Sequence, residues 1–111
     1  MESDSAISVL SALAQPSRLE CFRLLVSHEP EGLAAGEIAR QIGVPQNTMS
    51  THLAILARAG LIQSARQSRS IVYRARLDAL RELSLFLLKD CCGGNTQICA
   101  PLIEELTASC C

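Results

Sequence analysis

Five of the six cysteines in this 111-residue chain lie in its last 21 residues, where their spacing could hold a soft ion. Cys91 and Cys92 are adjacent, and Cys99 follows after a polar segment that begins with Gly93-Gly94. Neighbouring residues of an α-helix point about 100° apart, so adjacent thiols converge on one ion only where a helix ends. The two glycines supply such an end, and the loop after them can return Cys99 to the pair.

The chemistry of this triad favours a metalloid over zinc. A site of three thiolates without His or carboxylate suits As(III) or Sb(III). A structural zinc site wants four ligands, commonly in CxxC pairs, and the sequence contains no CxxC. We therefore expect Cys91, Cys92 and Cys99 to bind As(III), with Sb(III) or methylarsenite as alternatives and no organic cofactor. Cys110 and Cys111 could be accessory thiols, although we favour no essential role for them.

Composition predicts one small folded domain. Hydrophobic residues make up 49% of the chain, which excludes a disordered class. No apolar run reaches the ~18–20 residues of a membrane span, and the acidic start Met1-Glu2-Ser3-Asp4 is unlike a signal peptide. We expect a cytoplasmic protein without a membrane partner. In that reducing compartment, cysteines indicate metal or redox chemistry before disulfides.

The net charge of −1 conceals a basic segment. No Asp or Glu occurs between Ile38 and Leu77, and six arginines lie inside: Arg40, Arg58, Arg66, Arg69, Arg74 and Arg76. A forty-residue segment of charge +6 is typical of a surface that meets nucleic-acid phosphates. Charge alone would also fit an ordinary solvated basic face.

The elements that position these residues follow from periodicity and breakers. Helices are predicted over about 4–14, 17–27, 35–42, 46–59, 77–90 and 101–108, with a hairpin of 61–66 and 71–76 around the tetrad 67–70. The order α-α-α-α-β-β-α-α is mostly α with one β-hairpin.

Side-chain spacing predicts which faces of the first two helices are buried. Asp4 should cap the first helix, whose apolar stripe is expected to be Ile7, Leu10 and Leu13. The inner face of the second helix is expected to hold Leu19, Phe22, Leu25 and Val26. Cys21 lies between Leu19 and Phe22 and is predicted to be a buried core thiol.

Two short helices joined through Gly43-Val44-Pro45 and followed by a hairpin indicate a winged helix-turn-helix. The second helix of such a pair lies in the major groove. Met49, Leu53 and Leu56 recur at i, i+4 and i+7 and should face the core. The outward residues, which can bond to bases or phosphates, are then Gln46, Asn47, Ser50, Thr51 and Arg58.

Three further residues are candidates for this interface. His52 flanks the core stripe, so a DNA contact and a satisfied structural histidine fit it about equally. Arg66 and Arg69 lie at or near the hairpin tip, where a wing would hold them against a phosphate strand or in a minor groove.

The fifth predicted helix is apolar around most of its circumference, through Leu77, Leu80, Leu83, Leu85, Phe86, Leu87 and Leu88. Such a helix needs burial on more than one side. We therefore expect a homodimer through the first and fifth helices. The alternative is burial of this helix wholly within one chain.

Several motifs together resemble the ArsR/SmtB family of winged-helix metalloregulators, over about residues 7–88. They are Leu13-Ala14-Gln15-Pro16-Ser17-Arg18, Leu24-Leu25, Glu37-Ile38-Ala39, Gly43, Met49-Ser50-Thr51-His52-Leu53, Leu56, Ala59-Gly60-Leu61 and Tyr73-Arg74. The resemblance implies a homodimeric repressor that leaves a palindromic operator when a metal or metalloid binds. It also implies two departures, since the family often has Ser at the position of Pro45 and Gly at that of Ser68.

The resulting interpretation is a DNA-binding repressor rather than an enzyme. Residues 1–90 would form the DNA-binding and dimerisation domain, and residues 91–111 a cysteine-rich inducer-binding tail. The main alternative is a repressor of the same fold that senses oxidants or persulfides, using Cys21 and Cys91 if Cys21 is exposed. A thiol enzyme such as an arsenate reductase would need an activated cysteine, and a metalloid-storage protein would leave the arginines unused.

Overall fold

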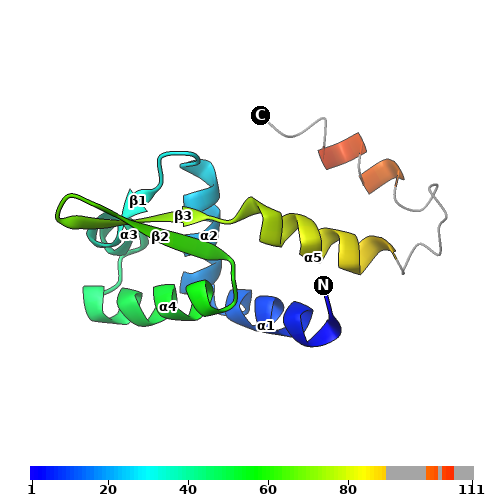
Figure 1. Cartoon of the computed structure of the whole chain (residues 1–111), viewed down its shortest axis with the longest axis horizontal. Coiled ribbons are helices and arrows are strands. Elements are labelled where there is room, and N and C mark those ends of the chain that lie inside the picture. Colours follow the sequence, from blue (N-terminus) through cyan, green and yellow to red (C-terminus); the bar gives the residue numbers. More distant parts are fainter. Residues whose placement is uncertain (90–99, 103, 107–111) are drawn as a thin grey trace.

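The computed structural model describes residues 1–89, 100–102 and 104–106. Along the chain lie α1 (Ser3–Leu13), α2 (Pro16–Ser27), β1 (Leu33–Ala34), α3 (Ala35–Ile42), α4 (Gln46–Arg58), β2 (Ile62–Gln67), β3 (Ser70–Ala75) and α5 (Leu77–Lys89) (Figure 1). Residues 100–102 and 104–106 are also helical. The predicted mostly α fold with one hairpin is confirmed.

The sheet contains a strand that the sequence did not predict. Its order is β1-β3-β2, all antiparallel. In the hairpin, Ile62 pairs with Ala75 and Gln67 with Ser70, so only Ser68 and Arg69 form the turn. The strands thus lie one residue from their predicted bounds. Strand β1 is only two residues long, too short to show a period of two.

The buried face of α1 differs from the predicted one. Ala6, Val9 and Ala12 are buried, whereas Ile7 is 63% and Leu10 43% exposed. Leu13, the third predicted residue, is partly buried and packs against the core. Both sets have the same three-residue spacing, so periodicity could not choose between them. Small side chains allow α1 to lie close to α2 and α4, which it contacts.

Two smaller predictions about the first helices are also wrong. Leu19 is 44% exposed, while Phe22 and Leu25 of the same helix belong to the core. Asp4 lies in the first turn of α1, and the N-cap is Glu2, which makes no side-chain cap bond.

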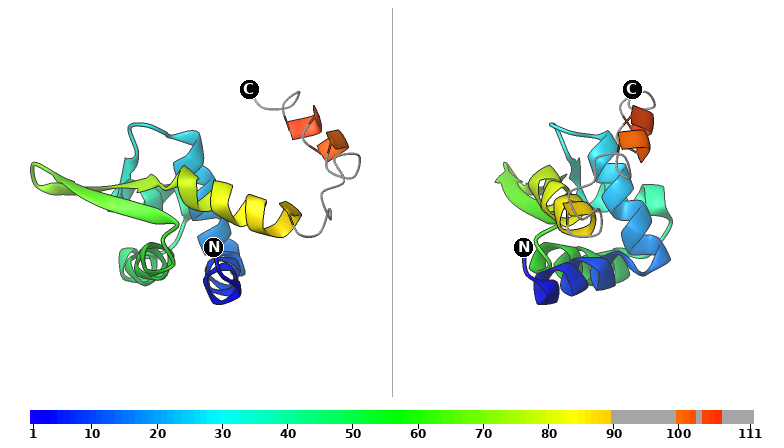
Figure 2. Two further views of the ribbon diagram at one scale, coloured as in Figure 1. Left: turned by 45° about the vertical axis from the view of Figure 1, so that its right-hand side comes forward. Right: turned by 90° about the vertical axis from the view of Figure 1, so that its right-hand side faces the viewer.

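Helix α5 leaves much of its apolar surface uncovered. Ala79 and Leu83 are buried, but four leucines are exposed: Leu77, Leu80, Leu85 and Leu87. The described residues of one chain therefore do not bury the whole helix. Helix α5 extends away from the sheet and the hairpin tip, and it contacts α1 (Figures 1 and 2). In the described part of the chain, no helix has the length and apolar character needed to span a membrane.

We predict that Gly32→Ala destabilises the fold. Gly32 has a φ of 74°, and an added Cβ would lie 2.4 Å from the Tyr73 carbonyl oxygen. Backbone strain and this clash together should lower the free energy of unfolding by about 2 kcal/mol or more. Gly60→Ala is the matched control, because its φ is 82° but nothing lies within 4 Å of the added Cβ. It should cost about 1 kcal/mol. Equal losses for the two variants in urea unfolding would contradict the clash.

Candidate nucleic-acid interface

Helix α4 is held to the core by the three residues that the sequence predicted. Met49, Leu53 and Leu56 are at most 1% exposed. Because they fix the rotation of α4, the opposite face reaches the surface. The outward residues are all exposed, as predicted: Gln46, Asn47, Ser50, Thr51 and Arg58.

Helix α4 begins without a hydroxyl cap, as expected from Pro45 at the position where the ArsR/SmtB family often has Ser. Pro45 is the N-cap and provides no side-chain bond. Asn47 replaces part of the missing cap, because its Oδ1 accepts a hydrogen bond from the Thr48 backbone N–H at 2.9 Å. Thr51 Oγ1 donates to the Asn47 carbonyl at 3.4 Å. The amide NH₂ of Asn47 and the hydroxyl of Ser50 make no hydrogen bond within the described residues and can donate to bases.

His52 lies between the two roles that the sequence left open. The residue is half-buried. Its Nδ1 is buried and has no hydrogen-bond partner among the described residues. The expectation of a fully satisfied structural histidine therefore fails at this nitrogen. A DNA contact by the other ring nitrogen, Nε2, stays a prediction.

The structure divides the six arginines into two groups. Three pair with carboxylates from outside the basic segment: Arg40 with Glu37, Arg74 with Glu29 at 2.9 Å, and Arg76 with Asp78 at 3.0 Å. Arg58, Arg66 and Arg69 make no ion pair within the described residues. The charge of +6 counted along the sequence therefore overstates the positive charge of this surface, because half of the six arginines pair with carboxylates in the folded chain.

The pairs also set the local pKa values. Hydrogen bonds from Arg40 and Gln41 lower the pKa of Glu37 to about 2. A hydrogen bond from Arg76 lowers the pKa of Asp78, and Glu29 raises that of Arg74. Glu37 and Asp78 therefore stay ionised to lower pH than unpaired carboxyls would.

The hairpin presents the other two unpaired arginines. Arg66 is on β2 and Arg69 is in the turn, and both are exposed. Ser68 has a φ of 57°, the left-handed conformation that glycine adopts most easily. The turn therefore has backbone geometry that suits glycine, although serine occupies the position. The hairpin and α4 lie at the same end of the molecule, opposite α5 (Figures 1 and 2).

The predicted thiol ligands lie outside the described residues. These are Cys91, Cys92 and Cys99, together with the accessory candidates Cys110 and Cys111. Among the residues that the structure does describe, no group of three His, Cys, Asp or Glu side chains could hold a metal ion. Cys21 is a fully buried free thiol, as predicted, and burial raises its pKa to about 11.

A helix pair with an exposed polar second helix, followed by an arginine-bearing hairpin, defines a winged helix-turn-helix DNA-binding protein. A family described as "Helix-turn-helix domain" matches residues 13–64. The chain is 33% identical to nodulation protein NolR of Rhizobium meliloti over 95 residues, which cover 86% of this chain and 75% of NolR.

Solved structures agree with this assignment. The homodimeric winged helix-turn-helix domain Mb0332 of Mycobacterium bovis, a possible ArsR-family regulator, matches with a TM-score of 0.65 and 27% identity, over 81% of this chain and 82% of that one. A possible transcriptional regulator for arsenical resistance matches with a TM-score of 0.64 and 26% identity, over 72% and 80%. The chain belongs to the ArsR family of transcriptional regulators.

We predict that Arg66→Gln and Arg69→Gln weaken DNA binding through lost phosphate contacts. Each lost contact should reduce the slope of log affinity against log salt by about 0.9. Arg76→Gln removes the same charge from an arginine that Asp78 already pairs, so it should change affinity much less. Fluorescence anisotropy at several salt concentrations measures these slopes. An equal loss for Arg76→Gln would show that net charge alone matters.

Proposed function

We propose that the protein is a homodimeric repressor that leaves a palindromic operator when As(III) binds Cys91, Cys92 and Cys99. Sb(III) and methylarsenite are the alternative inducers. The observation that carries the proposal is the place of the cysteines in the sequence, directly after the end of α5. This helix leaves four of its leucines exposed and extends to Lys89, two residues before Cys91 in the sequence. A ligand bound there would act on an interface helix.

The exposed apolar residues support a dimer through α1 and α5. Ile7 and Leu10 on α1 and Leu80 and Leu87 on α5 are exposed, and the two helices contact each other. A second copy would cover this surface, and the similar Mb0332 domain is homodimeric. A two-fold dimer carries two recognition helices related by symmetry, so its binding site should be a palindrome.

The ligand preference rests on the chemistry of the thiols. Three thiolates without imidazole or carboxylate suit a soft trivalent ion. The similarity to a possible regulator for arsenical resistance points in the same direction.

Release of DNA requires coupling between the thiols and α4. Allosteric coupling is typically ~1–3 kcal/mol, or ~5–150-fold in affinity. Nearly complete derepression would need the upper end of this range or more. A change at the end of α5 that alters the dimer interface would change the spacing of the two recognition helices, and DNA affinity with it.

The burial of Cys21 counts against the main alternative. An oxidant or persulfide sensor that bridges Cys21 and Cys91 needs an accessible thiolate. Cys21 is 0% exposed, and burial raises its pKa to about 11, so it forms less thiolate at neutral pH than an exposed thiol.

We predict that arsenite lowers the affinity of the wild-type protein for duplex DNA. The probe is a duplex enriched by the protein from a random-sequence pool, and the measurement is fluorescence anisotropy. Single replacement of Cys91, Cys92 or Cys99 by Ser should abolish the response and leave DNA binding intact. The double variant Cys110→Ser/Cys111→Ser should respond like the wild type. Unchanged affinity of the wild type in arsenite would refute the sensor.

We also predict that Cys21 makes stability fall at alkaline pH. Burial raises the thiol pKa from 9.0 to about 11, so the unfolded chain loses this proton first. The contribution is complete below about pH 9 and is lost as pH rises towards 11, by about 2–3 kcal/mol in total. Urea unfolding of the wild type and of Cys21→Ala at several pH values isolates this effect. A difference between them that does not change with pH would indicate an accessible Cys21.

A further inference from the structure

A pocket lined by two arginines lies beside α4, the expected recognition helix. Its volume is about 330 Å³, and it lies between α1, α2 and α4. Ser8 and Ser11 of α1, Arg18 of α2 and Arg58 of α4 supply its polar side chains, and no carboxylate is among the described residues that line it. Two guanidinium groups and two hydroxyls without an acid are the donors that a phosphate needs.

Arg18 is held in place by its own hydrogen bonds. Its backbone N–H donates to Gln15 Oε1 at 2.8 Å, and its Nε donates to the Ala12 carbonyl at 2.6 Å. Nη2 lies 3.5 Å from the Ser11 carbonyl oxygen. Nη1 makes no hydrogen bond within the described residues. The guanidinium is therefore fixed at the end of α1 with donors to spare.

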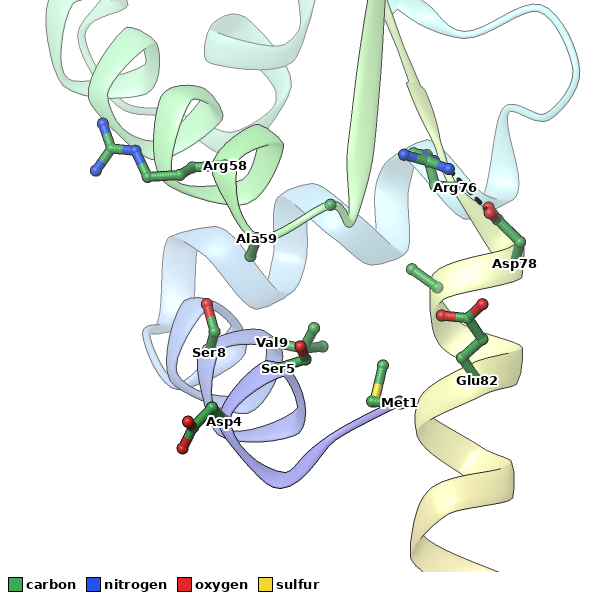
Figure 3. A pocket seen from close by; sticks show the side chains of 12 residues that line it. Met1, Asp4, Ser5, Ser8, Val9, Arg58, Ala59, Arg76, Asp78 and Glu82 are labelled. Carbon is green, nitrogen blue, oxygen red and sulfur yellow. Dashed lines mark hydrogen bonds and ion pairs between the residues drawn. The ribbon is translucent and has the colours of Figure 1, made fainter.

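Arg58 connects the pocket to the DNA-reading face. It follows Asn47 by eleven residues and Thr51 by seven, about three and two helical turns, so the three share one face of α4. Its guanidinium points away from α5 in Figure 3. Helices α1 and α4 lie along the same edge of the molecule (Figures 1 and 2). DNA bound to α4 would therefore pass the pocket.

The larger neighbouring pocket shows why the smaller one suits an anion. It has a volume of about 470 Å³ and lies between α1, the end of α4 and the start of α5 (Figure 3). Asp4, Asp78 and Glu82 line it, and its Arg76 pairs with Asp78. Three carboxylates would repel a phosphate. Ser8 and Arg58 line both pockets, whereas Ser11 and Arg18 line only the smaller one, which has no carboxylate among its described lining residues.

We propose that Ser8, Ser11, Arg18 and Arg58 bind a backbone phosphate of the operator. The DNA interface then extends from α4 and the hairpin onto α1 and the start of α2. The inference rests on the proposed function, because it assumes specific duplex binding. Free inorganic phosphate has the same chemistry, but the position beside the reading face of α4 favours DNA.

Charge changes at Ser11 test the pocket. Ser11→Asp should weaken binding to the enriched duplex by about tenfold or more, and Ser11→Lys should strengthen it and steepen the salt dependence. A gain of affinity cannot arise from misfolding. Ser3→Asp and Ser3→Lys are matched controls, since Ser3 is exposed on the same helix and lines neither pocket. They should change affinity by less than about twofold, because salt screens exposed charges beyond ~8–10 Å.

A double-mutant cycle tests whether Ser11 and Arg58 meet the same phosphate. If they do, Arg58→Gln combined with Ser11→Asp should weaken binding by less than the product of the two single effects. Equal effects at Ser11 and Ser3, or strictly multiplicative effects in the cycle, would overturn the proposal. So would calorimetric binding of inorganic phosphate that Ser11→Asp abolishes while duplex affinity stays unchanged. If no duplex is enriched by the wild type, the proposed function itself fails.

Discussion

The DNA-reading surface depends on the burial of one stripe of α4. Met49, Leu53 and Leu56 are packed into the core, and they leave a single orientation in which short polar residues face outward. The start of the helix adds little stability, since Pro45 supplies no side-chain cap. The outward face adds no apolar contact either. Packing therefore positions residues whose own helix propensity is poor. This is expected of a helix selected for contacts with bases.

Much of this arrangement was predictable because it is local. Helix α3 has the predicted bounds, 35–42, since Gly43 ends it in a left-handed conformation. The stripe of α4 was predictable because its apolar residues have one consistent spacing. Strand β1 was not, because it exists only through pairing with β3. The burial of α1 was also missed, because two sets of residues with equal spacing compete and only the contact distance to α2 and α4 decides between them.

The charges show the same limit more clearly. Arg74 and Glu29 are 45 residues apart in the sequence, yet their side chains pair at 2.9 Å. A charge count along the chain cannot include such a partner. Of the six arginines in the basic segment, Arg58, Arg66 and Arg69 have no ion pair within the described residues, and the sequence had already placed these three in the interface for other reasons. The sequence alone fitted both a phosphate-binding surface and an ordinary solvated basic face. The fold favours the first, because the arginines outside the expected interface are the ones that pair with carboxylates.

Helix α1 gives this small domain a physical connection between its two surfaces. Its small residues pack against α2 and α4, and it also contacts α5. Its exposed Ile7 and Leu10 face outward next to the uncovered leucines of α5 in the proposed dimer. A shift of α5 caused by a ligand at its end must therefore either move α1 or break its contacts. Because α1 also borders the pocket that Arg58 shares with Arg18, such a shift would change the proposed phosphate-binding residues and the spacing of the proposed dimer together.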